Sequence, residues 1–183
     1  MFEKKQRAIF FDRDGVLNYS KVVDGKPYAP RELNEFVLYP GINSFIKRAK
    51  SLGFVTLVVT NQPDIGHGLL ELETMEAMHS ILKAYLDIDD IYFCPHRQSD
   101  ECACRKPRTG MIERATNEFN LDLRRSWLIG DRITDIMTAE KAGINAIFID
   151  RGYRESLDMY PSCKIVSRFA SAMRYIFEFS EGS

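Results

Sequence analysis

The chain has 183 residues, of which 45% are hydrophobic and 28% are charged, and its formal net charge is -1. This length suits a single domain over residues 1–183, with a composition typical of a globular protein. The balanced charge offers no electrostatic footprint for nucleic acid, and no apolar run approaches the ~20 residues that span a bilayer. We therefore expect neither nucleic acid nor a membrane as a partner.

The N-terminal segment lacks the apolar core of a secretory signal. Lys4, Lys5 and Arg7 precede only four apolar residues before Asp12. We therefore expect a cytoplasmic protein, in which the four cysteines stay reduced and are metal ligands or small buried residues rather than disulfides. We also expect a monomer, because no exposed apolar stripe is evident along the chain.

Short apolar runs alternate with segments of helical periodicity. We expect strands at residues 8–11, 54–59, 91–93, 127–129 and 146–149, and a last short strand from residue 164. We expect helices at residues 42–52, 70–86, 110–119, 134–142 and 169–177, with a frayed end at 180–183. This alternation predicts an α/β fold, a three-layer sandwich around a mostly parallel, Rossmann-like sheet with right-handed crossovers.

The first predicted strand ends in two carboxylates. The run Ala8 to Phe11 has no polar alternation, which is typical of a strand covered on both faces, and Asp12, Asp14 and Gly15 follow it. In an extended chain, residues i and i+2 point the same way, so the carboxylates of Asp12 and Asp14 should face one point. Like charges so placed repel unless a cation or a shared proton holds them together. This favours a metal-assisted site, and a surface turn rich in Asp is the alternative.

Later strands bring more polar groups to the same edge of the sheet. The strand over residues 54–59 is followed by Thr60, Asn61 and Gln62. The strand over residues 127–129 is followed by Asp131, with Asp135 about one helical turn further on. The carboxyl edge of a parallel sheet is where open α/β proteins bind their ligands.

These groups form a set suited to a hard cation and a phosphoryl group. Asp12, Asp14 and Asp131 suit Mg²⁺, which prefers oxygen ligands and retains waters and substrate oxygens. Lys106 supplies a compact positive charge, and Arg105 supplies a planar fork that matches phosphate. Each feature alone also fits a helix cap, a turn or a solvated surface pair, but their shared order along the chain favours a site.

A cysteine-rich loop precedes these two cations. Three thiolates and one imidazole could complete a four-coordinate, structural Zn²⁺ site: Cys94, His96, Cys102 and Cys104. Reduced thiols without a metal are the alternative. Residues 97–101 carry too little apolar surface to become ordered by burial, so a zinc ion would stabilise this loop and fix Arg105 and Lys106 beside the site.

Four ordered motifs resemble those of the haloacid dehalogenase superfamily of phosphatases, over about residues 8–150. They are Asp12-Arg13-Asp14-Gly15-Val16-Leu17-Asn18, Thr60-Asn61-Gln62, Arg105-Lys106-Pro107 and Gly130-Asp131-Arg132-x-x-Asp135. The resemblance implies that Asp12 attacks phosphorus to form an aspartyl phosphate. It also implies that Asp14 protonates the leaving oxygen and then activates the hydrolytic water.

The resemblance further implies the metal ligands and the substrate contacts. Asp12, the backbone carbonyl of Asp14 and Asp131 would hold Mg²⁺, and Asp135 would lie behind them, orienting metal-bound waters or Lys106. Thr60 and Lys106 would bind the transferring phosphoryl group, which needs alignment and charge neutralisation. Other substrate contacts are expected from Arg13, Asn61, Gln62, Arg105 and Arg132.

The cysteine loop narrows the resemblance to a zinc-loop branch. This branch contains heptose 1,7-bisphosphate phosphatases, which act on the D-glycero-D-manno sugar, and histidinol-phosphate phosphatases. The short intervals between the motifs leave no room for a large cap domain, which implies an open site with selectivity supplied by loops.

The loop after the second motif favours the heptose bisphosphate group. Residues 60–68 are similar to that group's loop, which implies a small sugar bisphosphate that loses its 7-phosphate. Asp64 and His67 depart from the group's pattern, and Asp64 subtracts positive potential where a second phosphate would bind. Lys26 and Tyr28 would lie near the opening, as sugar contacts or as plain loop residues. The alternatives are a histidinol-phosphate phosphatase, another small-molecule phosphomonoesterase and a non-catalytic module that binds a phosphorylated ligand.

Overall fold

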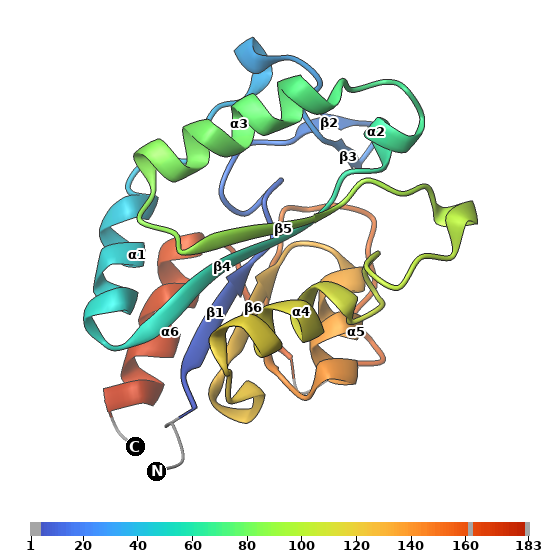
Figure 1. The fold of residues 1–183 in the computed structure, drawn as a ribbon. Helices are drawn as coiled ribbons and strands as arrows, with labels where there is room; N and C mark the ends of the chain where they lie inside the picture. Colours follow the sequence, from blue (N-terminus) through green and yellow to red (C-terminus); the bar gives the residue numbers. More distant parts are fainter. Residues whose placement is uncertain (1–4, 161–162, 182–183) are drawn as a thin grey trace.

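The structure is a computed structural model that describes residues 5–160 and 163–181. A six-stranded sheet, parallel throughout, forms the middle layer of the molecule (Figure 1). Its strands are, in spatial order, β5 (Asp90–Cys94), β4 (Phe54–Asn61), β1 (Arg7–Phe11), β6 (Trp127–Gly130), β7 (Asn145–Ile149) and β8 (Lys164–Val166). The predicted α/β fold class is confirmed.

Helices cover both faces of this sheet. They are α1 (Ile42–Ser51), α2 (Pro63–Gly66), α3 (Leu72–Tyr85), α4 (Gly110–Phe119), α5 (Ile133–Ala142) and α6 (Phe169–Glu181). Short 3₁₀ turns lie at Leu33–Glu35, Gln98–Asp100 and Leu123–Arg125. The predicted helices at 42–52, 70–86, 110–119 and 134–142 match α1, α3, α4 and α5 to within two residues at each end. None of the helices in the described ranges is long and apolar enough to cross a bilayer.

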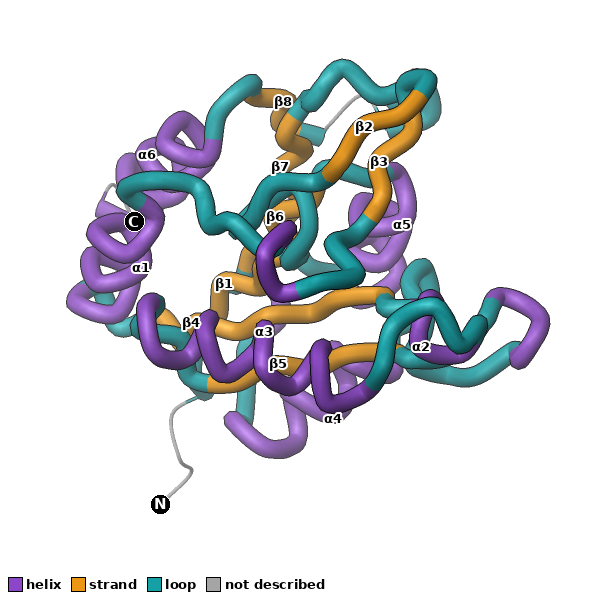
Figure 2. Tube along the Cα trace, turned by 90° about the horizontal axis from the view of Figure 1, so that it is seen from above, coloured by secondary structure: helices purple, strands orange, loops and turns teal. Residues whose placement is uncertain are grey.

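Two apolar clusters form the core, one on each face of the sheet. Ile9 and Phe11 of β1 belong to the cluster that α1, α3 and α6 cover, and both views show α1 and α6 side by side (Figures 1 and 2). Ala8 and Phe10 belong to the other cluster, under α4 and α5. Successive residues of β1 therefore bury side chains on opposite faces, which explains why this strand is apolar without alternation.

Three features differ from the expected elements. A hairpin joins β2 (Lys21–Val23) to β3 (Lys26–Tyr28) through Asp24 and Gly25, whose φ angles are 51° and 73°. Asp-Gly is a common sequence for a two-residue hairpin turn with both φ angles positive, so the hairpin could have been predicted from these two residues. The short helix α2 was also not anticipated. Finally, α6 continues to Glu181 instead of fraying from 180, while residues 182–183 lie outside the described residues.

Candidate active site

A cavity of about 270 Å³ opens at the carboxyl edge of the sheet. The parallel register creates it, because Phe11 of β1 pairs with Val58 of β4 and with Ile129 of β6. The residues just after Phe11, Val58 and Ile129 therefore lie close together. The cavity is lined by Asp12, Asp14, Ser20, Pro27, Tyr28, Ala29, Thr60, Asn61, Gln62, Pro63, Asp64, Arg105, Lys106, Asp131, Arg132 and Thr134.

Three buried carboxylates meet at this edge. Asp12, Asp131 and Asp135 each offer an oxygen, and these oxygens lie within 4.8 Å of one another. Lys106 Nζ lies 2.8 Å from Asp12 Oδ1 and 2.6 Å from Asp135 Oδ1, and it donates to the carbonyl of Val59 at 2.9 Å. One lysine thus faces three carboxylates in a space from which water is largely excluded.

The protonation equilibria reflect this excess of negative charge. Burial raises the pKa of Asp12 to about 7, against the lowering effect of Lys106. Burial also raises the pKa of Asp131 well above its ordinary value, and Asp12 and Asp135 add to the shift. Burial lowers the pKa of Lys106, yet Asp12 and Asp135 raise it by more, so the net direction is upward. A further positive charge would relieve the carboxylates.

The residues at this edge fit a divalent cation. Both carboxylate oxygens of Asp131 are buried, and the Tyr153 hydroxyl supplies a hydrogen bond that lowers the pKa of Asp131, which leaves at least one oxygen without a partner in the part of the chain that the structure describes. Buried polar atoms without a partner are rare and costly in native proteins. A hard cation would satisfy them, since carboxylate oxygens are the ligands that Mg²⁺ prefers.

Asp14 lies at the cavity but outside this carboxylate group. Its carboxylate accepts hydrogen bonds from Arg13 Nη2 at 3.0 Å, Asn18 Nδ2 at 2.9 Å and Gln62 Nε2 at 2.7 Å. Asp12 and Asp14 nevertheless line the same cavity, and the charge of Asp14 contributes to the raised pKa of Asp12, as expected of two carboxylates that face one point. The chain between them is not extended as expected, because β1 ends at Phe11 and the N–H groups of residues 16–18 all turn back to the Arg13 carbonyl.

Arg13, expected as a substrate contact, is not at the cavity. Its side chain is fully buried and pairs with Asp14, with Nη1 3.3 Å from Nε2 of His79 on α3. The sequence alone does not indicate whether the guanidinium group of an arginine just after a buried strand points to the cavity or to the core. The structure thus assigns this residue to the support of Asp14 rather than to the ligand.

The other expected contacts do line the cavity. The side-chain amide of Asn61 donates to the Lys106 carbonyl at 3.1 Å and accepts from the Lys106 N–H at 3.0 Å, which fixes the backbone there. Gln62 Nε2 donates to Thr60 Oγ1 at 2.8 Å as well as to Asp14. Arg132 Nε pairs with Glu155 at 2.5 Å, and Arg105 Nη1 donates to the His96 carbonyl at 3.3 Å.

Residues from the hairpin complete the cavity, and the sequence indicated only one of them. Tyr28 of β3 lines it, whereas Lys26 is not among the lining residues. Ser20, just before β2, was not anticipated. Asp64 also lines the cavity, where it pairs with Arg31 Nε at 2.7 Å. Recognising the Asp24-Gly25 turn would have placed Ser20 and Tyr28 together at the opening.

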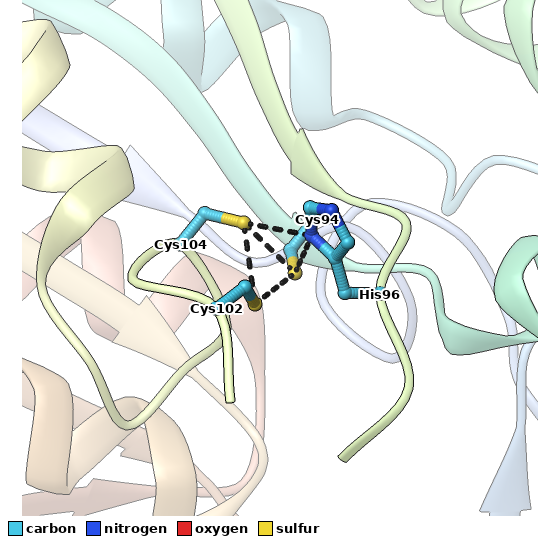
Figure 3. A group of neighbouring side chains, drawn as sticks. All are labelled: Cys94, His96, Cys102 and Cys104. Atoms are coloured by element: carbon cyan, nitrogen blue, oxygen red, sulfur yellow. Dashed lines mark hydrogen bonds between the residues drawn. The ribbon is translucent and has the colours of Figure 1, made fainter. Parts of the chain in front are cut away.

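The cysteine loop brings its four expected ligands together (Figure 3). Cys104 Sγ lies 3.1 Å from Cys94 Sγ, 3.2 Å from His96 Nδ1 and 3.5 Å from Cys102 Sγ. In a tetrahedral zinc site with Zn–S bonds of about 2.3 Å, the sulfur atoms are about 3.8 Å apart. Slight expansion of the cluster would therefore admit a metal ion, and the donor set of three thiols and an imidazole suits zinc.

This cluster is joined to the cavity through the sheet. Cys94 is the last residue of β5, it pairs with Asn61 of β4, and its carbonyl accepts a hydrogen bond from the Gln62 N–H at 2.7 Å. On the other side, Cys104 precedes Arg105 and Lys106 directly. The loop thus connects two parts of the cavity wall.

Comparisons with known proteins agree with this geometry. A family model described as HAD-hydrolase-like matches residues 103–167. The D-glycero-beta-D-manno-heptose-1,7-bisphosphate 7-phosphatase of Helicobacter pylori (strain ATCC 700392 / 26695) is 36% identical over 146 residues, which cover 76% of this chain and 79% of the relative. The corresponding alpha-anomer enzyme of Burkholderia mallei is 36% identical over 157 residues, which cover 79% and 80%.

A solved structure has the same fold. The D,D-heptose 1,7-bisphosphate phosphatase of B. bronchiseptica, complexed with magnesium and phosphate, superposes with a TM-score of 0.81 at 26% identity. The match covers 94% of this chain and 98% of that one. Sequence relatives at this identity and coverage, with a matching fold and strand-end carboxylates, show that the chain belongs to the heptose bisphosphate phosphatase family of haloacid dehalogenase-like hydrolases.

Proposed function

We propose that the chain removes the 7-phosphate from D-glycero-D-manno-heptose 1,7-bisphosphate, with Mg²⁺ as cofactor and an aspartyl phosphate as intermediate. The observation that carries the proposal is the buried group of Asp12, Asp131, Asp135 and Lys106 at the end of the cavity. It combines a nucleophile, a cation-binding set and a fixed positive charge. The names of the relatives support the substrate, since they act on this sugar bisphosphate as either anomer.

The residues of the cavity suit an in-line transfer to Asp12. A carboxylate oxygen of Asp12 attacks phosphorus, the bond to the sugar oxygen breaks, and Asp14 gives its proton to that oxygen. Asp14 then takes a proton from water, which attacks phosphorus and releases phosphate with the Asp12 carboxylate restored. Lys106 and the Thr60 hydroxyl stabilise the phosphoryl oxygens during both transfers.

The magnesium ligands in this proposal are Asp12, Asp131 and the backbone carbonyl of Asp14. Bound Mg²⁺ would supply charge neutralisation for the carboxylates and the phosphoryl group. Asp135 would orient Lys106, which it contacts at 2.6 Å. The B. bronchiseptica relative, which holds magnesium and phosphate, supports this choice of cofactor.

We propose that the four-residue cysteine cluster holds a structural Zn²⁺. Protein atoms fill all four positions, so no position is open for substrate. Arg105, Asn61, Gln62 and Arg132 would contact the sugar or its phosphates from the cavity wall. One domain, a monomeric state and a cytoplasmic location stay predictions.

Replacing the nucleophile tests the reaction. We expect Asp12→Asn to abolish phosphate release with Mg²⁺ while the protein stays folded, because an amide cannot attack phosphorus. Phosphate release would be measured with both heptose 1,7-bisphosphate anomers and with histidinol phosphate, and folding by circular dichroism. Near wild-type hydrolysis by the variant would refute the nucleophile, and a preference of the wild type for histidinol phosphate would refute the sugar.

A further inference from the structure

A buried arginine, Arg13, binds the carboxylate of Asp14, which is the acid and base of the proposed reaction. Arg13 is the largest fully buried side chain in the described ranges, and its Nε and Nη2 both reach the Asp14 carboxylate. The Nε atom lies 3.2 Å from Asp14 Oδ1, and Nη2 lies 3.0 Å from Asp14 Oδ2. A two-point contact of this kind fixes the plane of the carboxylate as well as its position.

The remaining guanidinium nitrogen is held from helix α3. Arg13 Nη1 lies 3.3 Å from Nε2 of His79, a residue that is 9% exposed. Since arginine only donates, Nε2 must accept, so the imidazole is neutral at this contact. Burial and the charge of Arg13 agree with this, because they lower the pKa of His79 to about 3.

Aromatic rings hold this pair from the sides. The Phe36 ring lies 5.5 Å from the guanidinium carbon of Arg13, and the Phe93 ring meets the His79 ring edge-on at 5.6 Å. His79 supplies a hydrogen-bond acceptor for Arg13 Nη1. Without that acceptor, a buried donor would lack a partner, and the guanidinium would turn to find one.

We infer that His79 is a positioning residue for the acid–base step, acting through Arg13 on the orientation of the Asp14 carboxylate. This inference rests on the proposed function, in which Asp14 protonates the leaving oxygen. Asn18 and Gln62 also hold Asp14, so loss of His79 would misorient the carboxylate rather than release it.

The inference predicts a dependence on the leaving group. An oxygen of high pKa needs a proton as its bond to phosphorus breaks, whereas p-nitrophenolate leaves without one. Impaired proton donation therefore slows poor leaving groups more than good ones. A loss of stability alone would slow both equally.

The test uses substituted phenyl phosphates with the magnesium-loaded enzyme. Their leaving groups extend from p-nitrophenol to phenol and p-methoxyphenol, and kcat/KM is followed because it reports steps up to the first irreversible transfer. For His79→Leu we expect a loss of less than about 3-fold on p-nitrophenyl phosphate and at least about 10-fold on phenyl phosphate, part of what a general acid contributes.

Two further variants separate positioning from packing. His79→Gln keeps an acceptor near Nη1, so we expect it to restore the wild-type dependence on leaving-group pKa. Met78→Leu changes a buried neighbour on α3 without removing that acceptor, and we expect the wild-type dependence there as well. If His79→Leu fails to fold, His79→Asn, whose amide is shorter, replaces it with the same expected loss.

The outcomes distinguish this inference from the proposed function. A wild-type enzyme that hydrolyses none of the esters, and no heptose bisphosphate, would overturn the proposed function. An active wild type whose leaving-group dependence is unchanged in His79→Leu would overturn the inference alone. The same holds if His79→Gln is as impaired as His79→Leu on phenyl phosphate.

Discussion

Gly15 lies where no larger side chain fits beside Asp131. Its φ angle is +82°, and a Cβ atom built there would lie 1.8 Å from Asp131 Oδ2. A side chain at this position must therefore displace the carboxylate that we propose as a magnesium ligand. The left-handed backbone adds a cost of its own for any residue with a Cβ atom.

We predict that Gly15→Ala lowers kcat by about 100-fold or more, the scale reported for misplacement of a catalytic group. The backbone strain should also cost about 1–2 kcal/mol of stability. Gly53→Ala is the matched control, because its φ angle is +80° with nothing within 4 Å of the added atom. It should lose similar stability and keep its activity. Equal activities of the two variants would show that the Asp131 position does not matter.

His79 also makes stability depend on pH. Its pKa is lowered to about 3 by burial and Arg13, with a smaller lowering by Lys83 and an opposing effect of Asp14. In the unfolded chain the pKa is about 6.5, so between the two values the unfolded state binds the extra proton. Stability from this group is thus present above pH 6.5 and lost as pH falls.

We predict that the free energy of unfolding falls between pH 7 and pH 5 by up to about 1.4 kcal/mol per pH unit more in wild type than in His79→Gln. Urea unfolding at several pH values measures this difference. The comparison with the variant removes effects of the other titrating groups. Parallel pH profiles of the two proteins would mean that His79 takes up its proton in the folded state over the same pH range as in the unfolded chain.

The loop from Cys94 to Cys104 acts as an element of its own between β5 and α4. The residues inside it are mostly exposed, so we expect its order to depend on the four-residue cluster. Because Cys104 adjoins Arg105 and Lys106, the state of the cluster should influence the cavity.

We predict that removal of zinc by a chelator lowers activity at least about 10-fold, as disturbed support around a site commonly does, without loss of the sheet. Metal content, circular dichroism and phosphate release would be measured together. Cys104→Ser should lose the zinc and behave like the chelated protein, whereas Cys163→Ser, outside the cluster, should retain it. A zinc-free protein with undiminished activity would show that the metal in the loop does not influence the reaction.

Helices and strands with a strong apolar periodicity were predictable from the sequence, whereas elements without such a pattern were missed. Buried strands and helices such as β4 and α4 follow apolar patterns that the core imposes. The hairpin β2–β3 has no such pattern, since Val22 and Val23 are exposed and one strand contains Pro27. Its turn chemistry alone signalled it.

The candidate site, like the fold, was predictable where it follows from the order of the strands. Asp12, Thr60 and Asp131 meet because parallel strands end at one edge, which strand order along the chain implies. Whether a side chain at that edge faces the cavity or the core depends on turns just beyond the strands. This is why the position of Asp12 was predictable, whereas the burial of Arg13 was not.

The whole molecule depends on α6 to close one face of the sheet. Ala172, Met173 and Ile176 of this helix are fully buried in the cluster shared with α1 and β1. The last described helix thus completes a core that begins with the first strand. Its contribution is to stability, because none of its residues lines the cavity.

We predict that Ile176→Ala lowers the free energy of unfolding by about 2–5 kcal/mol, the usual cost of a cavity in a core. Glu178→Ala, on the exposed side of the same helix, should change it by no more than about 0.5 kcal/mol. Urea unfolding gives both values, and kcat at 25 °C should be unchanged in both variants. A large fall in kcat for Ile176→Ala would connect α6 to the reaction.

The parallel sheet also separates the ends of the described chain from the opening. β1 starts at the edge opposite Asp12, and α6 ends beside the start of β6, where Phe179 packs against Trp127 at 5.4 Å. A linker attached to an exposed side chain near the end of α6, such as Glu178, would therefore lie away from the cavity entrance. The protein could be immobilised there with the cavity facing the solution.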